Sequence, residues 1–205
     1  MRRRGRDSGQ AFPVYIAVVA GLLFLAFAYF LVAQAASTRS DAQTAADAAA
    51  LAAAQDARGR LREGWLEVIL DPGQWRGFLN GEADVGPSPC EQAAVFAARN
   101  MARLSSDGCV SLGSERRGFS VTVRTMDQKP RDATASAEAV IEPLCTFTEP
   151  EPTLDPEPPP TETADPEEGK GAILGLACDG AAWEIDPENP TLPDAADLFA
   201  VRLSK

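Results

Sequence analysis

The chain has 205 residues, a formal net charge of −11 at pH 7 and no histidine. Without histidine it lacks the usual general base, the Ser-His and Cys-His nucleophile pairs and the commonest metal ligand. It also contains no glycine-rich phosphate loop and no four-cysteine zinc spacing. These absences argue against an enzyme and predict neither a cofactor nor a metal site. The acidic charge disfavours nucleic acid or anionic lipid as a partner of the exposed part.

An uncharged stretch at residues 11–36 directly follows a leader in which four of the first six residues are arginine. About 20 apolar residues at ~1.5 Å each span the ~30 Å hydrocarbon core, and a segment in lipid must satisfy its own backbone hydrogen bonds. The stretch is therefore predicted to be a transmembrane helix. Because positive charge beside such a helix stays in the cytoplasm, we expect residues 1–10 inside and the rest of the chain outside the cell membrane.

A cleaved signal peptide is the alternative, since Ala33-Gln34-Ala35 fits the small-x-small cleavage pattern behind a basic leader. The apolar core of a signal peptide is usually about 7–15 residues long. Residues 12–32 form a core of twenty-one, with aromatic residues near both ends, where interfacial aromatics sit. We therefore expect a retained, single-pass anchor.

The anchor leads into residues 41–58, which hold ten alanines in eighteen positions. Alanine is the best helix former, so the helix is predicted to continue unbroken to about Arg58 or beyond. An alanine-covered rod buries little apolar area and has little reason to fold against a globular core. Two interpretations stay open, a simple stalk or a thin cylinder that neighbouring helices approach closely. The predicted helix-packing residues are Ala46, Asp47, Ala49, Ala50 and Ala53.

The short basic leader ending in DSGQA, the hydrophobic helix and the stretch QTAADAAALAAAQDA together resemble the N-terminal region of TadE/TadG-like Flp pilus assembly proteins, in particular the actinobacterial form. Gln43 and residues 45–52 match the alanine-rich signature of that family position by position. The resemblance covers roughly residues 5–60. It implies a pseudopilin-like membrane component that assembles with pilins or other pilus-assembly membrane proteins.

The resemblance also raises the question of processing, because prepilin peptidases of this system cut after a glycine. The candidate cut is Gly9–Gln10, and Pro13 then lies at the entry to the helix. Classical pilins carry glutamate at the fifth mature position, whereas Val14 stands there in this chain. This departure fits the TadG-like members, which are often anchored and not obviously processed.

An α+β fold is predicted for the outer part, with a helix on a small antiparallel sheet. A short helix is expected through about residue 70, and a second helix from Ser88 that stops at residues 106–108. Trp65, Trp75 and Phe78 are expected in the core or at a docking surface. Strands are predicted at 109–112, 119–125 and 134–142, followed by one strand within 173–186, which carries Trp183 between sheet and helix, and another at 198–203.

Residues 149–168 carry eight acids and seven prolines, so this segment is predicted to be disordered or polyproline-like. It is read either as a solvated loop or as a tether to basic or calcium-rich cell wall material. The predicted organisation is a leader (1–10), a transmembrane helix (11–36), an alanine-rich stalk (37–62), an outer domain (63–148), an acidic loop (149–169) and strands that complete the domain (170–205).

The cysteines are four, an even number, and they are widely spaced with no CxxC pair. This pattern predicts two structural disulfides. If the second helix ends where the strand at 109–112 begins, Cys109 lies at the far end from Cys90. The preferred pairing is then Cys90–Cys145 with Cys109–Cys178. The alternative is Cys90–Cys109 with Cys145–Cys178. Four acids near the C-terminus could hold calcium but lack EF-hand spacing: Asp186, Glu188, Asp194 and Asp197.

Two classes of function follow from the sequence. The first is a membrane-anchored structural component of Flp pilus or related secretion-system assembly, which acts by helix packing and by contacts of its outer domain. The second is a single-pass envelope adhesin or cell-wall-binding module that shares only the anchor type.

Overall fold

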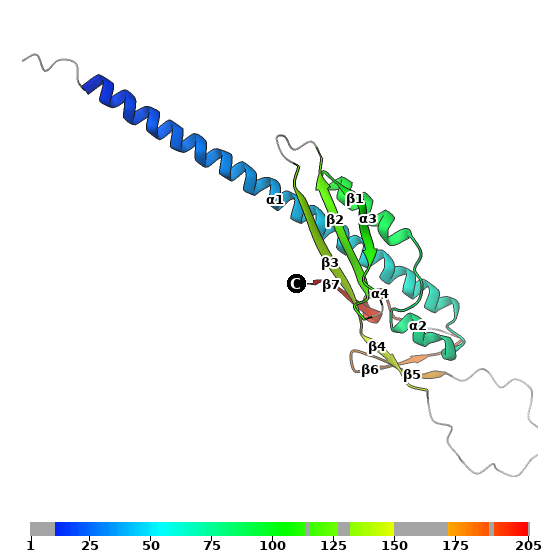
Figure 1. The fold of residues 1–205 in the computed structure, drawn as a ribbon. Helices are drawn as coiled ribbons and strands as arrows, with labels where there is room; N and C mark the ends of the chain where they lie inside the picture. Colours follow the sequence, from blue (N-terminus) through cyan, green and yellow to red (C-terminus); the bar gives the residue numbers. More distant parts are fainter. Residues whose placement is uncertain (1–10, 114, 127–131, 150–171, 189–190, 205) are drawn as a thin grey trace, which may run out of the picture.

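The computed structural model describes residues 11–113, 115–126, 132–149, 172–188 and 191–204. Its dominant element is a single helix, α1 (Ala11–Glu67), which runs for 57 residues and about 85 Å. Figure 1 shows that the N-terminal part of α1 stands alone, whereas its C-terminal part is enclosed by the remaining elements. The predicted unbroken helix beyond Arg58 is confirmed.

The other helical elements are short. A 3-10 turn, η1 (Pro72–Gln74), follows α1 and leads into α2 (Trp75–Leu79). The separate helix expected before this turn is instead the end of α1. α3 (Ser88–Arg99) begins at the predicted residue, and α4 (Ala195–Leu198) precedes the last strand.

The larger sheet has four antiparallel strands in the order β1-β2-β3-β7. They are β1 (Ala102–Ser111), β2 (Gly118–Thr125), β3 (Thr134–Pro143) and β7 (Phe199–Ser204). A smaller antiparallel sheet contains β4 (Cys145–Phe147), β5 (Ile173–Cys178) and β6 (Ala181–Ile185). Helices α1 and α3 pack on the larger sheet (Figure 1), so the α+β fold class is confirmed.

Apolar and polar residues alternate along β2, and small apolar residues of β3 pair with the apolar ones. This pattern decides which face of the larger sheet is buried. Phe119, Val121 and Val123 of β2 point toward the helices and are at most 7% exposed. Their partners on β3 include Ala139 and Ala137, which belong to the same core. Because successive strand residues point to opposite faces, the serine, threonine and arginine residues between them form a polar outer face.

The alanine-rich half of α1 is the centre of this core, contrary to the expectation of a rod that stands free of the globular part. From Ala42 onward its alanines, except the half-buried Ala48, are buried against the sheet and α3. Small side chains let the helix backbone approach two neighbours closely, so many small contacts replace a few large ones. Trp65 and Trp75 continue the core and meet edge to face, with ring centroids 5.4 Å apart.

The boundary between α3 and β1 also differs from the prediction. The helix ends at Arg99, because the Asn100 side chain caps the Phe96 carbonyl and Met101 adopts a left-handed conformation with φ of 55°. β1 then begins at Ala102 and is much longer than the predicted strand at 109–112. It contains a bulge between Leu104 and Cys109.

The C-terminal strands pair differently from the expected arrangement. Residues 173–186 form a hairpin, β5 and β6, that turns at Asp179 and Gly180, which both have positive φ. The hairpin pairs with β4, and the place beside β3 belongs to β7. Trp183 is half-buried at the edge of the core in the smaller sheet.

The two disulfides are Cys90–Cys109 and Cys145–Cys178, so the preferred pairing was wrong and the alternative is correct. Because α3 ends early, β1 runs back along it and returns Cys109 to the start of the helix beside Cys90. Cys145 and Cys178 are register partners of β4 and β5.

We predict that the native protein contains both of these disulfides. Alkylation without reduction should label no cysteine, and mapping of unreduced peptides should recover the two pairs. Replacement of Cys145 and Cys178 together by serine should lower the free energy of unfolding by about 3–4 kcal/mol, because the bond closes a separation of 33 residues. Peptides that link Cys90 to Cys145 would contradict the fold.

The alanine face gives a second prediction. Ala53 is fully buried, so Ala53→Leu should lower the free energy of unfolding of the domain by about 1–3 kcal/mol through overpacking. Gln55→Leu places the same side chain at an exposed position of the same helix and should change it by less than about 0.5 kcal/mol. Denaturant unfolding of the full chain in detergent measures both. Equal stability of the two variants would show that α1 is a stalk.

Candidate functional site

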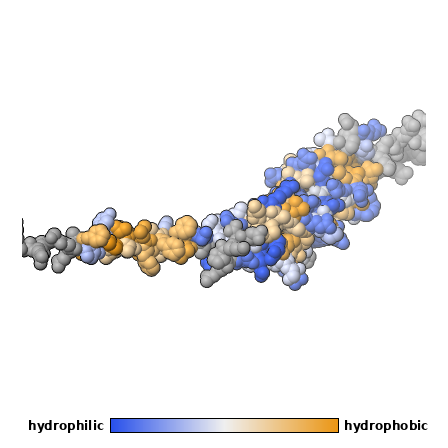
Figure 2. Space-filling view, turned by 90° about the horizontal axis from the view of Figure 1, so that it is seen from above, coloured by the Kyte–Doolittle hydropathy of each residue, from blue (hydrophilic) through white to orange (hydrophobic). Residues whose placement is uncertain are grey.

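The free part of α1 is a continuous apolar surface. Its large side chains from Phe12 to Val32 are between 50% and 77% exposed, except for Val19, which is half-buried. Figure 2 shows this apolar rod beside a mostly hydrophilic domain. Exposure of so much apolar area in water is unfavourable by roughly 25 cal/mol per Å². Within the described residues, α1 is the one helix long and apolar enough to cross a membrane, so lipid is the natural environment of this surface.

A short polar segment joins the apolar half of α1 to the buried half. Arg39 and Asp41 are the first charged residues after the uncharged stretch. The hydroxyl of Thr38 donates to the Gln34 carbonyl, and that of Thr44 donates to the Ser40 carbonyl. These bonds satisfy the hydroxyl groups within the helix, which therefore crosses the polar segment without a break. The anchor and the domain consequently share one rigid element.

The residues predicted to pack against neighbouring helices have partners within this chain. Ala46, Ala49, Ala50 and Ala53 are fully buried in the core formed with the sheet and α3. Asp47 is half-buried at the rim of this face, where its carboxylate accepts a hydrogen bond of 2.8 Å from the Gln43 amide. In this conformation the alanine face is therefore not available to a second protein.

Gln43 also links α1 to the sheet. Its amide nitrogen donates to the Ser136 carbonyl oxygen of β3 at 3.4 Å. This contact lies where β3 extends beyond the end of β7, since Ser204 pairs with Glu138. Two polar residues of the family-like stretch, Gln43 and Asp47, thus mark the rim of the alanine face.

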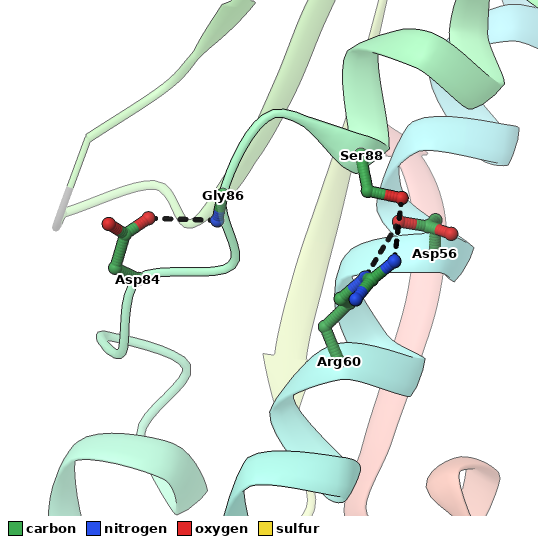
Figure 3. A network of polar contacts seen from close by, with 5 residues as sticks. All are labelled: Asp56, Arg60, Asp84, Gly86 and Ser88. Atoms are coloured by element: carbon green, nitrogen blue, oxygen red, sulfur yellow. Dashed lines mark hydrogen bonds and ion pairs between the residues drawn. The ribbon is translucent and has the colours of Figure 1, made fainter.

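Polar contacts that sequence reasoning missed fix the far end of α1 to the domain (Figure 3). Arg60 donates to the Ser88 hydroxyl at 3.1 Å and lies 3.7 Å from the Asp56 carboxylate. The loop before α3 is shaped by Asp84, whose carboxylate accepts from the Gly86 amide. Single arginines on an alanine-rich helix carry no distinctive sequence signal, so these partners emerge only from the fold.

A cavity of ≈ 310 Å³ lies between α1, the loop before α3 and the β1–β2 connection. Ala57, Leu61 and Phe119 supply apolar lining, and the ion pair of Arg117 with Glu82 borders it at 3.2 Å.

The C-terminal acids serve local structure in the described chain. Asp194 and Asp197 form a capping box at α4, and Asp186 accepts from the Glu188 amide. No cluster suited to a metal ion occurs among the residues that the structure places. The candidate processing site, Gly9 and Gln10, lies outside the described residues, as does the acidic segment apart from Glu149.

Comparison with known proteins bears on the first quarter of the chain. The model of the family Tad, described as "Putative Flp pilus-assembly TadE/G-like", matches residues 9–56. No curated protein and no solved structure matches the chain. The match covers the apolar half of α1 and most of the alanine face, which confirms the resemblance found in the sequence. It supports, at the level of the family, a membrane protein related to Flp pilus assembly.

Proposed function

We propose that this protein is a membrane-anchored structural component of Flp (tight adherence) pilus or related secretion-system assembly. The observation that carries the proposal is that the family match lies on α1, which is bare apolar surface in one half and domain core in the other. One continuous helix therefore couples a membrane position to the position of the folded domain.

The mechanism is pseudopilin-like in its use of a long N-terminal helix, with one difference in the surfaces available. Because the alanine face is occupied by the sheet and α3, contacts with pilins or other assembly proteins come from the apolar half of α1 and from the exterior of the domain. Helix association within lipid relies on van der Waals packing, for which the exposed half of α1 is free.

The proposed orientation has the N-terminus in the cytoplasm and the domain outside. The arginine-rich leader supports it through the positive-inside rule. The two disulfides support it independently, because such bonds persist in oxidising compartments and are rare in the cytosol.

The intact mass of the membrane-extracted protein tests retention of the anchor. We expect the mass of the full chain, because a twenty-one-residue apolar core exceeds the usual ~7–15 residues of a cleaved segment. A mass that begins at Ala36 or Ser37 would indicate a secreted protein. A mass that begins at Gln10 would indicate a processed pilin.

Replacement of residues 12–32 by an unrelated apolar helix of equal length tests the assembly function. Equal length keeps the phase of α1, so the domain should fold and export normally, with both disulfides formed. We expect pilus assembly, measured by surface pilin, to fall at least tenfold, because the partner-facing side chains are lost. Leu22→Ile is the conservative control and should assemble normally. Full assembly by the replaced protein would favour the adhesin or cell-wall-binding alternative.

A further inference from the structure

Two arginines face each other on the outer surface of the larger sheet. Arg103 of β1 and Arg124 of β2 are direct cross-strand partners and both are exposed. Like charges directly opposite each other destabilise a sheet, and no ion pair in the described part of the chain includes either arginine. The next partner along this row of the ladder is Thr134 of β3, which carries no compensating charge. No carboxylate among the described residues compensates the pair, so the arrangement favours the binding of an external anion.

An exposed apolar residue lies at the same end of the sheet. Met101 immediately precedes β1, is 68% exposed and has a φ of 55°. Its carbonyl accepts a hydrogen bond of 2.8 Å from the Met126 amide, which continues the β1–β2 ladder past Ala102. A residue with a side chain is uncommon in this left-handed region, where glycine or asparagine is favoured. The fold thus presents a methionine beside the two arginines at a cost in backbone energy.

The continuity of α1 places this end of the sheet toward the membrane. β3 runs in the same direction as α1, since Ser136 lies beside Gln43 and Ile141 lines the same cavity as Ala57. Gln43 is seven residues beyond the uncharged stretch, or about 10 Å along the helix. Arg124 pairs with Thr134, two residues nearer the membrane than Ser136.

The distance is short enough for the charge of a bilayer surface to act. Headgroups extend about 5–8 Å beyond the hydrocarbon core, and the Debye length at physiological salt is ~8 Å. We propose that Arg103, Arg124 and Met101 form a docking surface for anionic phospholipid headgroups of the membrane in which α1 is anchored. This inference rests on the proposed membrane anchoring. It refines the expectation from net charge, because eight of the acids lie in residues 149–168, whereas Arg103 and Arg124 place two positive charges at the end of the sheet nearer the bilayer.

The test compares the full chain reconstituted in nanodiscs of phosphatidylcholine alone and of phosphatidylcholine with 30% phosphatidylglycerol. We expect the domain to unfold at a Tm on the order of 5 °C higher in the anionic discs, and 0.5 M salt should abolish this difference. In the double variant Arg103→Gln/Arg124→Gln the dependence on anionic lipid should disappear. In phosphatidylcholine alone the same variant should be more stable than the native chain, because the repulsion is removed.

Arg76→Gln is the matched control, since Arg76 is exposed on α2 at the opposite end of the domain. It should keep the full lipid-dependent shift. An equal Tm of the native chain in both kinds of disc would overturn the proposal. Loss of pilus assembly in the double variant without any lipid dependence would also overturn it and would assign the surface to an acidic protein partner. If the native chain enters neither kind of disc, the proposed membrane anchor itself is refuted. Co-purification of the chain with lipid measures this outcome separately from the Tm.

Discussion

The fold depends on the close approach between the alanine face of α1 and the structures that cover it. A helix lined with leucine would hold the sheet and α3 farther from its axis, whereas alanine lets both lie against the backbone. Each alanine removes little apolar area from water, so the contact is made strong by its length, from Ala42 to Ala57, and by the tryptophans beyond it. The same residues that make α1 a good helix also make it a good core.

This packing changes what the family resemblance means. The matched stretch, residues 9–56, looks like an anchor followed by a free alanine rod when only its composition is considered. In the fold, its second half is the element on which the outer domain is built. The domain is therefore built on the continuation of its anchor helix, and a force on the membrane half of α1 is a force on the domain.

Sequence reasoning succeeded where a pattern has one physical meaning. The alternation at residues 119–125 identified β2, and the proline and acid around Ser88 identified the start of α3. It failed where one pattern has two meanings. An alanine run is compatible both with a free helical rod and with a helix that is buried on any of its faces. It also failed at Met101, whose left-handed conformation has no sequence signal. Because the end of α3 was predicted too late, β1 was predicted to be too short, and Cys109 was placed far from Cys90. This misplacement led to the wrong disulfide pairing.

The acidic segment and the arginine pair are attached at opposite ends of β3, and the topology of the sheet fixes this separation. The segment at residues 149–168, which carries eight acids, joins the fold through β4 and β5, at the end of β3 that lies farthest from the bilayer. The bond between Cys145 and Cys178 closes the base of that segment and fixes where it leaves the domain. Arg103 and Arg124 lie at the other end of the same sheet. An anionic surface would therefore attract the near end, whereas the attachment of the acidic segment lies at the far end, beyond the ~8 Å over which the charge of that surface acts.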